Sequence, residues 1–449
     1  MNNNLAMAQK LAEAVAQKSG TAYLVGGYVR DILRGEKNKD IDIEVHGVRP
    51  NELEEILDSL GSRINIGESF GIYALRGYSL DIAMPRREKL RGRGHRDFDI
   101  FVDPYLGTKK AALRRDFTVN AMMQNILTGE ITDHFGGRDD LKHKIIRHVN
   151  DDTFAEDPLR VLRAAQFAAR FEFKIANETV ELCKKISLTA LSKERIEGEL
   201  YKALLKAERP SVFFEEMRRM NALSDWFPEL EALIGVEQNP LYHAEGNVWN
   251  HTMMVLDCAA KYRDKVKNPR GFMLASLVHD FGKAVCTKTK NGAVRSIGHE
   301  TEGLPLIREF LHRITGERDI IRYVLNMAEL HMEPNKLAAD KSSVKATNKL
   351  FDKSCEPLDL IYLAAADDMG RIAEGDSGAD LPFLLERLSL YEETMAKPYV
   401  TGNDLIATGL KPDETFTDIL AYAHKLRLAG VEKESALKQT LSYAMSYKK

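Results

Sequence analysis

The stretch YVRDILRGEKNKDIDIEVHG, residues 28–47, places Asp40 and Asp42 on either side of an isoleucine and continues with apolar residues at alternate positions. This period of two is typical of a β-strand. Because residues i and i+2 of a strand share a face, we expect the two carboxylates to project together. Adjacent carboxylates repel each other unless a cation lies between them. The stretch predicts a strand carrying a metal site, although a solvated acidic edge more often explains an isolated D-x-D.

The residues before this strand make the metal site the better explanation. LVGGYVRD places Gly26 and Gly27 after an apolar run and before a helix that carries Arg30. Glycines there let backbone N–H groups approach a phosphate, and a helix N-terminus favours an anion. Mg²⁺ prefers oxygen ligands and often uses one or two carboxylates together with substrate phosphates. We therefore expect a phosphate cradle beside a Mg²⁺ site, with Asp81 on a second strand-like run as a candidate third carboxylate or base.

Composition limits the class of protein. A chain of 449 residues is too long for one average core, so we expect two to four domains. The formal net charge of −3 gives no global basic field, and nucleic-acid binding would need local clusters of Lys and Arg. The four cysteines show no CxxC spacing, which indicates reduced thiols. No apolar run reaches the roughly 18 residues of a membrane span, so we expect a cytoplasmic protein that does not enter a membrane.

The periodicity changes along the chain and indicates an α+β fold. Short strand-like runs alternate with helices up to about residue 145, and helical spacing dominates afterwards. Loops are expected at residues 234–247 and 287–303. We predict a small mixed α/β head followed by an all-helical body, a second helical domain and a helical tail. The expected boundaries are 1–145, 146–235, 236–375 and 376–449.

The head resembles that of class II tRNA nucleotidyltransferases and bacterial poly(A) polymerases. The resemblance begins with LVGGYVRD and KDIDIE and continues in order along the chain. The later motifs are RRDFTVNAM at 114–122, DHFGGRDDL at 133–141, EDPLRVLRAAQFAARF at 156–171 and ERIEGEL at 194–200. It implies that Asp40 and Asp42 hold two metal ions for nucleotidyl transfer. It also implies that Gly27, Arg30 and Arg115 contact nucleotide phosphates, and that Asn120 shapes the same wall.

The same resemblance assigns a base-reading role to the segment EDPLRVLRAAQFAARF. Asp157, Arg160 and Arg163 are spaced by three, so we expect them near one helical face. The family implies that Asp157 and Arg160 pair with the Watson–Crick edge of CTP or ATP, with Arg163 in the same nucleotide site. In isolation, an ordinary salt bridge would explain the spacing. Gln166 departs from relatives that often carry arginine, and the basic stretch at 84–101 resembles a flexible loop thought to help switch specificity from C to A.

A second constellation lies in the helical region. His279 and Asp280 are adjacent at the end of an apolar run, where both side chains need polar partners. Imidazole and carboxylate together suit a divalent metal, here Mg²⁺, Mn²⁺ or Ni²⁺. The order H…HD…H…H…D resembles the HD phosphohydrolase domain. It implies three sets of residues, namely four core metal ligands, two histidines typical of two-metal members, and two residues near the substrate. In that order, these sets are His251, His279, Asp280 and Asp367; His299 and His331; and His243 and Lys283.

Together, the two constellations resemble the bifunctional CCA-adding enzymes of bacteria. The resemblance implies addition of CCA to the 3′ end of tRNA from CTP and ATP, and phosphohydrolase activity in the HD part. We expect tRNA, CTP and ATP as partners, and no DNA. An enzyme that adds only A or only CC, a poly(A) polymerase, and an HD phosphohydrolase with a non-catalytic RNA-binding head stay open as alternatives. The sequence does not fix the oligomeric state.

Overall fold

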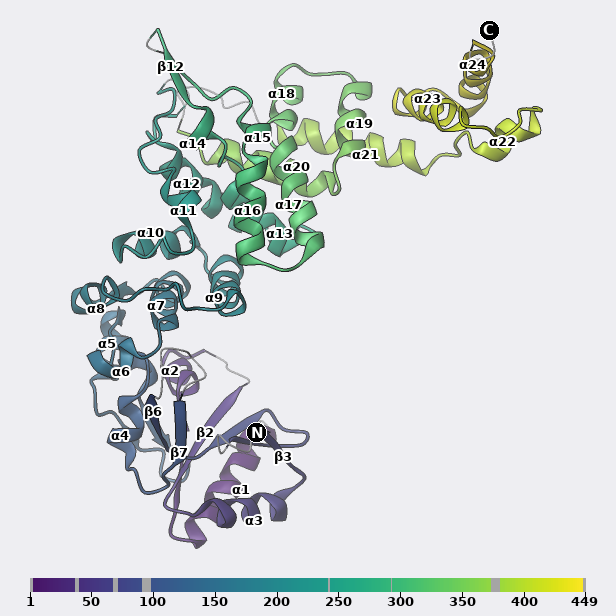
Figure 1. The fold of residues 1–449 in the computed structure, drawn as a ribbon. Helices are drawn as coiled ribbons and strands as arrows, with labels where there is room; N and C mark the ends of the chain where they lie inside the picture. The colour runs from purple at the N-terminus through teal and green to yellow at the C-terminus, as the bar shows by residue number, and fades with distance from the viewer. Residues whose placement is uncertain are drawn as a thin grey trace. The chain divides into compact units, whose positions relative to one another are not determined.

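The computed structural model describes residues 3–36, 40–67, 72–90, 98–240, 243–291, 293–372 and 380–446. The chain divides into two compact units, one of Met1–Ala203 with Val212–Trp226 and one of Leu204–Ser211 with Phe227–Lys449. Figure 1 shows the first unit combining strands with helices and the second built almost entirely of helices. The predicted fold class, a mixed α/β head followed by a largely helical chain, is confirmed. The finer division into four domains stays a prediction.

Seven of the described strands form one sheet in the order β3-β4-β5-β2-β1-β8-β9. They are β1 (Thr21–Val25), β2 (Ile41–His46), β3 (Arg63–Gly67), β4 (Ile72–Leu75), β5 (Leu80–Ala83), β8 (Met123–Asn125) and β9 (Ile131–Thr132). β2 lies in the middle, antiparallel to β1 and parallel to β5. A parallel pair needs a crossover connection, which here contains α3 (Pro50–Leu60) and the β3–β4 pair. β6 (Arg86–Leu90) and β7 (Phe98–Val102) form a separate hairpin.

The alternation read in β2 separates a core face from a polar face. Ile41, Ile43 and Val45 are buried in the core that the sheet forms with α1 (Asn3–Gln17) and α3. Asp42 and Glu44 take the alternate positions, so their side chains point to the other side of the sheet. Burial of the isoleucine and valine side chains stabilises the strand by about 1.5–3 kcal/mol each. This burial fixes the register that presents the acidic face.

Helices dominate from residue 108 to residue 219. They are α4 (Thr108–Leu113), α5 (Gly137–His143), α6 (Asp151–Ala155), α7 (Leu159–Phe171), α8 (Asn177–Cys183), α9 (Lys193–Lys206) and α10 (Ser211–Arg219), and α2 (Gly27–Leu33) precedes them in the sheet region. The 3₁₀ helix η2 (Thr118–Asn120) packs against α2 and α5. β10 (Ile145–Ile146) and β11 (Lys174–Ile175) add a short parallel pair.

The second unit is helical, with one described hairpin. Its helices are α11 (Pro228–Glu231), α12 (Val248–Ala260), α13 (Pro269–Val278), α14 (Lys283–Cys286), α15 (His299–Glu302), α16 (Leu304–Ile314), α17 (Arg318–Leu330), α18 (Glu333–Ala339), α19 (Val344–Lys353), α20 (Pro357–Met369) and α21 (Leu381–Ala396). Helices α12, α13, α17 and α20 pack against one another. The expected loop at 287–303 is wrong in part, because β12 (Lys288–Lys290) and β13 (Ala293–Arg295) pair there.

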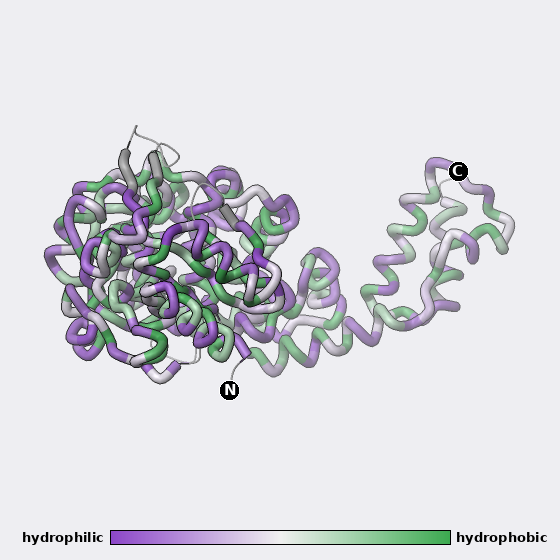
Figure 2. Tube along the Cα trace, turned by 90° about the horizontal axis from the view of Figure 1, so that it is seen from below, coloured by the Kyte–Doolittle hydropathy of each residue, from purple (hydrophilic) through white to green (hydrophobic). Residues whose placement is uncertain are grey.

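The C-terminal helices are α22 (Gly402–Ala407), α23 (Phe416–Leu428) and α24 (Lys433–Ser446). Figure 2 shows hydrophobic and hydrophilic residues alternating along this part of the chain, as in amphipathic helices. Their apolar faces meet in a small core that includes Val400, Leu405, Ile419 and Ala436. Within the described ranges, none of the helices is both long and apolar enough to cross a membrane.

Candidate active sites

Three carboxylates gather at the middle of the head sheet. β2 begins at Ile41, so Asp40 is an exposed residue just before the strand and Asp42 is a half-buried residue within it. Asp81 lies directly opposite Asp42 in the parallel β2–β5 register. Burial raises the pKa of the Asp42 carboxyl, Arg115 lowers it, and the charges of Asp81 and Asp40 raise it again. A cation between these oxygens would relieve the repulsion, so the donor set fits a hard divalent ion.

Sequence reasoning missed Glu44, which organises the same edge. Glu44 is 1% exposed, pairs with His46 Nε2 at 2.9 Å and accepts a hydrogen bond from Arg115 Nη2 at 3.4 Å. Gly26 has φ 67°, and a Cβ there would lie 3.2 Å from Asp42 Oδ2. The glycine therefore keeps open the space between Asp42 and Arg115. The alternation that revealed Asp42 continues to Glu44 and could have identified it.

A buried network joins three of the predicted nucleotide-site residues. Arg30 is 5% exposed and donates from Nη1 to Asn120 Oδ1 at 2.7 Å, while its guanidinium lies 4.5 Å from the centre of the Phe171 ring. Asn120 Nδ2 donates to Asp116 Oδ1 at 3.0 Å, and Arg163 Nε donates to Asp116 Oδ2 at 2.8 Å. Asp116, which sequence reasoning did not single out, therefore links α7 to α2. A Cβ at the neighbouring Gly27 would lie 3.3 Å from the Arg30 guanidinium.

The predicted base-reading residues lie at the start of α7. The helix begins at Leu159, so the expectation that Asp157 sits on its face is wrong, because Pro158 takes the N-cap position. Asp157 Oδ1 accepts a hydrogen bond from the Leu159 N–H at 3.1 Å, and Asp157 Oδ2 accepts one from Arg195 Nη2 at 2.9 Å. Arg160 donates to the backbone carbonyls of Thr153 and Arg114. The guanidinium has five N–H donors, so these bonds leave donors for a ligand.

Helix α9 supplies partners that sequence reasoning missed. Arg195 pairs with Asp157, and Glu199, 3% exposed, lies 3.9 Å from Arg163 Nη1. Both come from the ERIEGEL stretch, whose spacing of four places them on one face of α9. The basic loop expected at 84–101 falls partly outside the described residues, because 91–97 are not described; Arg87 of β6 pairs with Asp103.

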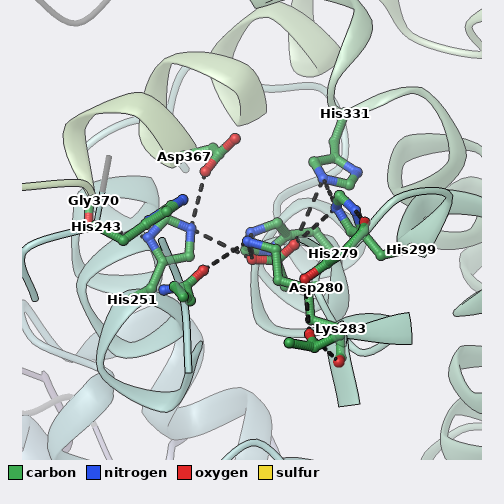
Figure 3. A network of polar contacts seen from close by, with 12 residues as sticks. His243, His251, His279, Asp280, Lys283, His299, His331, Asp367 and Gly370 are labelled. Atoms are coloured by element: carbon green, nitrogen blue, oxygen red, sulfur yellow. Dashed lines mark hydrogen bonds and ion pairs between the residues drawn. The ribbon is translucent and has the colours of Figure 1, made fainter. Parts of the chain in front are cut away.

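Figure 3 shows the second constellation, in which side chains from several helices converge on Asp280. His279 and Asp280 follow directly after α13, and His251 and Asp367 come from α12 and α20. His251 Nε2 lies 3.0 Å from Asp367 Oδ1 and 3.5 Å from Asp280 Oδ2. His279 Nε2 lies 3.4 Å from Asp280 Oδ2. One triad with donor atoms close enough for a metal ion is therefore His251, His279 and Asp367.

A second triad shares the same centre. His299 Nε2 lies 3.1 Å from Asp280 Oδ1 and 3.3 Å from His331 Nε2, and all three side chains are buried. Gly282 makes this approach possible, since a Cβ there would lie 2.0 Å from the His299 carbonyl oxygen. Burial lowers the pKa of His331 to about 3, and neighbouring histidine charge contributes. His331 is therefore neutral at pH 7, the form in which imidazole binds a metal.

The orientation of the histidine rings fits a divalent metal. The Nδ1 atoms of His279, His299 and His331 face the backbone carbonyls of Ser276, Ser296 and Ala328. A ring whose Nδ1 donates to a carbonyl keeps a lone pair on Nε2. His279 Nε2 is buried and makes no hydrogen bond within the part of the chain that the structure describes. All three Nε2 atoms lie within 4 Å of a carboxylate oxygen of Asp280. The described head contains no comparable triad of His, Cys, Asp or Glu.

A cavity of about 430 Å³ opens beside this centre. Asp280, Asp367 and His299 line one part of it, and Lys283, Arg295 and Arg371 add positive charge. Lys283 Nζ lies 2.7 Å from Asp280 Oδ2. Burial raises the pKa of Asp280, but Lys283 and His279 outweigh that effect and hold it well below its usual range. The cavity therefore combines metal-type ligands with cations that suit an anionic group.

Glu245, which sequence reasoning missed, contacts His251 at Nδ1, the ring nitrogen that does not face Asp367. Its Oε1 lies 3.1 Å from His251 Nδ1 and 2.7 Å from His243 Nδ1, and its Oε2 accepts a hydrogen bond from the Ile372 N–H at 2.9 Å. Burial raises the pKa of Glu245, but these hydrogen bonds lower it to about 2. Glu245, His243 and His251 form a third group with metal-ligand spacing. A carboxylate behind a ligating imidazole fixes its tautomer and orientation.

Family models match three successive parts of the chain. Residues 22–147 match the model described as "Poly A polymerase head domain". Residues 172–234 match "Probable RNA and SrmB- binding site of polymerase A", and residues 248–372 match "HD domain". The carboxylate site thus lies in the first match and the histidine site in the third.

Relatives and a solved structure cover most of the chain. The chain is 37% identical over 338 residues to a multifunctional CCA protein of Shewanella denitrificans, covering 74% of this chain and 78% of the relative. It is 34% identical over 426 residues to one of Cupriavidus metallidurans, covering 91% and 97%. A Thermotoga maritima CCA-adding enzyme complexed with tRNA has a TM-score of 0.66 at 22% identity, covering 97% of this chain and 94% of that one. At that identity, the structural likeness shows the fold.

Proposed function

Because this chain belongs to the family of multifunctional CCA proteins, we propose that it adds C, C and A to the 3′ ends of tRNA from CTP and ATP, and that its HD domain hydrolyses a phosphoester. The observation that carries the proposal is that one chain holds two separate groups of side chains suited to divalent metals. One is the group of Asp40, Asp42 and Asp81, and the other is the set of histidines around Asp280. A cytoplasmic location belongs to the same proposal.

In the head, Asp40 and Asp42 would hold Mg²⁺, with Asp81 beside them. Bound Mg²⁺ would supply activation of the 3′-hydroxyl and charge neutralisation at the α-phosphate and the leaving pyrophosphate. Arg115, held by Glu44 next to Asp42, adds fixed positive charge on the same side. Asn120 and Asp116, the buried partners of Arg30 and Arg163, hold α2 and α7 together. The glycine turn and α7 therefore keep a fixed separation.

The start of α7 would read the base. The Asp157 carboxylate accepts hydrogen bonds and the Arg160 guanidinium donates them, which matches an exocyclic amino group and a ring acceptor of cytosine or adenine. Both side chains are already oriented by protein partners, Arg195 for Asp157 and backbone carbonyls for Arg160. Preorganised polar groups discriminate better than mobile ones, because a wrong base leaves them unpaired. This pairing supports selection of C and A over U and G.

In the second unit, His251, His279, Asp280 and Asp367 would hold one divalent ion, and His299 and His331 would share Asp280 with a second. Mg²⁺, Mn²⁺ or Ni²⁺ suits this mixture of imidazole and carboxylate ligands. A divalent ion bound there would supply a deprotonated water and stabilise charge on a phosphoryl group. Lys283 and Arg371 would hold the ester in the cavity beside it.

Three tRNA transcripts test the proposed addition: one lacking CCA, one ending in C and one ending in CC. Each is incubated with the protein, Mg²⁺, and CTP and ATP singly or together, and the 3′ ends are sequenced. We expect all three to end in CCA when both nucleotides are present. Addition of A only to the CC-ended transcript, or arrest after CC, would contradict full CCA addition and indicate one half of a split pathway. Long A tails would indicate a poly(A) polymerase, and no addition would reject the head assignment.

A further inference from the structure

Gln238 stands out in the cavity beside the histidine site. It is 7% exposed and lines the cavity together with Asp280, Lys283 and His299. Its Oε1 accepts a hydrogen bond from Lys283 Nζ at 2.8 Å. Its Nε2 is buried and has no hydrogen-bond partner among the described residues. Leaving a buried amide donor unpaired costs free energy, so this donor calls for a ligand.

The orientation of the Gln238 amide follows from its partner. An ammonium group has three donors and no acceptor, so the atom that faces Lys283 must be the carbonyl oxygen. Lys283 is itself held by Asp280, with Nζ 2.7 Å from Oδ2. The chain Asp280–Lys283–Gln238 thus ties the amide to the proposed metal ligands and fixes Nε2 as a preoriented donor.

The groups around this donor define the chemistry of its ligand. Arg295 and Arg371 line the same cavity, and Lys283 adds a third positive charge. Of the carboxylates in the cavity, Asp280 pairs with His299 and Lys283, and Asp367 pairs with His251. Arg371 pairs with Asp368. An N–H donor among cations and beside a metal site suits an oxygen that carries negative charge. The phosphoryl oxygens of a phosphoester meet that description.

We propose that Gln238 is a substrate-binding residue of the HD site that donates an Nε2 hydrogen bond to a non-bridging phosphoryl oxygen. This inference rests on the proposed phosphoesterase function of that domain. Lys283 positions the amide through its carbonyl oxygen, and the metal ligands lie on the other side of Lys283. Gln238 therefore acts on binding of the phosphoryl group and not on retention of the metal.

Two substitutions separate the donor role from a structural one. Gln238→Glu keeps an oxygen acceptor for Lys283 but replaces the donor by a second oxygen. Gln238→Met keeps a similar side-chain volume and removes both the acceptor and the donor. Gln439→Glu, on the exposed surface of α24, is the matched control for the change of charge. Each substitution is made in the full-length Asp40→Ala/Asp42→Ala protein, which serves as the parent and lacks the proposed metal ligands of the head. Titration calorimetry measures the affinity for Mn²⁺ alone and then the affinity of the Mn²⁺-loaded protein for inorganic phosphate. Turnover of p-nitrophenyl phosphate gives KM and kcat separately.

We expect the Mn²⁺ affinity of Gln238→Glu and Gln238→Met to stay within a factor of about three of the parent. Their phosphate affinity should be about 10- to 100-fold weaker. KM should rise by a similar factor. If Gln238→Glu keeps the parental phosphate affinity and KM while Gln238→Met loses them, Gln238 only holds Lys283 and the inference is wrong. If the parent hydrolyses no ester, the proposed hydrolase function is wrong. The phosphate titration still tests whether Gln238 binds a phosphoryl oxygen. A parent that binds no phosphate overturns the inference.

Discussion

Asp116 shows how one buried carboxylate can hold the elements around a site. It is 8% exposed and accepts hydrogen bonds from Arg163, from Asn120 and from the Phe117 N–H. Burial raises its pKa, but Arg163 and these hydrogen bonds lower it below the ordinary value. Asn120 passes the contact on to Arg30 at the glycine turn. Asp116 has no proposed contact to substrate, yet it holds Arg163 and Asn120 directly, and Arg30 through Asn120, in the expected nucleotide site.

Asp116→Asn should destabilise the first unit by about 3 kcal/mol, the lower end of the range for breaking a buried ion pair, because Arg163 keeps partial access to solvent. The folded pKa of Asp116 is lowered, so the paired carboxylate contributes its full stability above the unfolded pKa of about 3.9, and that contribution is lost as the pH falls through the folded value. Urea unfolding should show a constant difference from the parent between about pH 5 and 8 and a shrinking one below about pH 4.

The matched control is Asp152→Asn on the exposed start of α6, which should shift the transition by less than about 0.5 kcal/mol. A difference between Asp116→Asn and the parent that grows as the pH falls from 5 to 4 would contradict the assigned ion pair.

At the scale of elements, several helices of the second unit end close to the histidine site around Asp280. α13 ends just before His279, Asp367 lies near the end of α20, and His331 follows α17 directly. Helix ends carry unpaired backbone carbonyls, and the histidine rings donate Nδ1 to carbonyls of this kind. The backbone thereby selects the tautomer that leaves Nε2 free for a metal.

Glu245→Gln should weaken divalent-metal binding in the second unit by about 10- to 100-fold, because His251 would lose the carboxylate that orients it. Titration of Mn²⁺ into the Asp40→Ala/Asp42→Ala background isolates that site from the head. Glu300→Gln serves as control, since Glu300 lies near His299 but is more exposed. Equal losses in the two variants would show that general charge, and not orientation of His251, governs the affinity.

The sequence predicted those features that follow from local periodicity. The alternation around Asp42 predicted β2 and its acidic face, and the apolar run before His279 placed that residue at a helix end. Arg195 was missed because only tertiary folding brings it to Asp157, 38 positions away. Glu245 was missed because it lies in a turn before α12, where no periodicity relates it to His251. The β12–β13 hairpin was missed because its strands have only three residues each and β12 is lysine-rich. Asp157 was expected near a helical face with Arg160 and Arg163, but α7 begins only at Leu159, after Pro158.

At the scale of the whole molecule, one chain carries two proposed sites, and among the described residues no side chain belongs to both. The carboxylates of β2 and β5 lie in the first unit, and the histidines around Asp280 lie in the second. Each set of side chains is held by contacts within its own unit, such as Glu44 with Arg115 and Glu245 with His251. Loss of one set should therefore leave the other chemically intact.

Reciprocal inactivation tests this account most directly. Asp40→Ala/Asp42→Ala and His279→Ala/Asp280→Ala proteins are each assayed for CCA addition to a tRNA transcript and for Mn²⁺-dependent phosphoester hydrolysis. The account predicts that the first variant loses addition by at least about 1,000-fold and keeps hydrolysis, and that the second does the reverse. If either variant retains the activity assigned to its site, or if both activities fall together in a correctly folded protein, the assignment of two independent sites is contradicted.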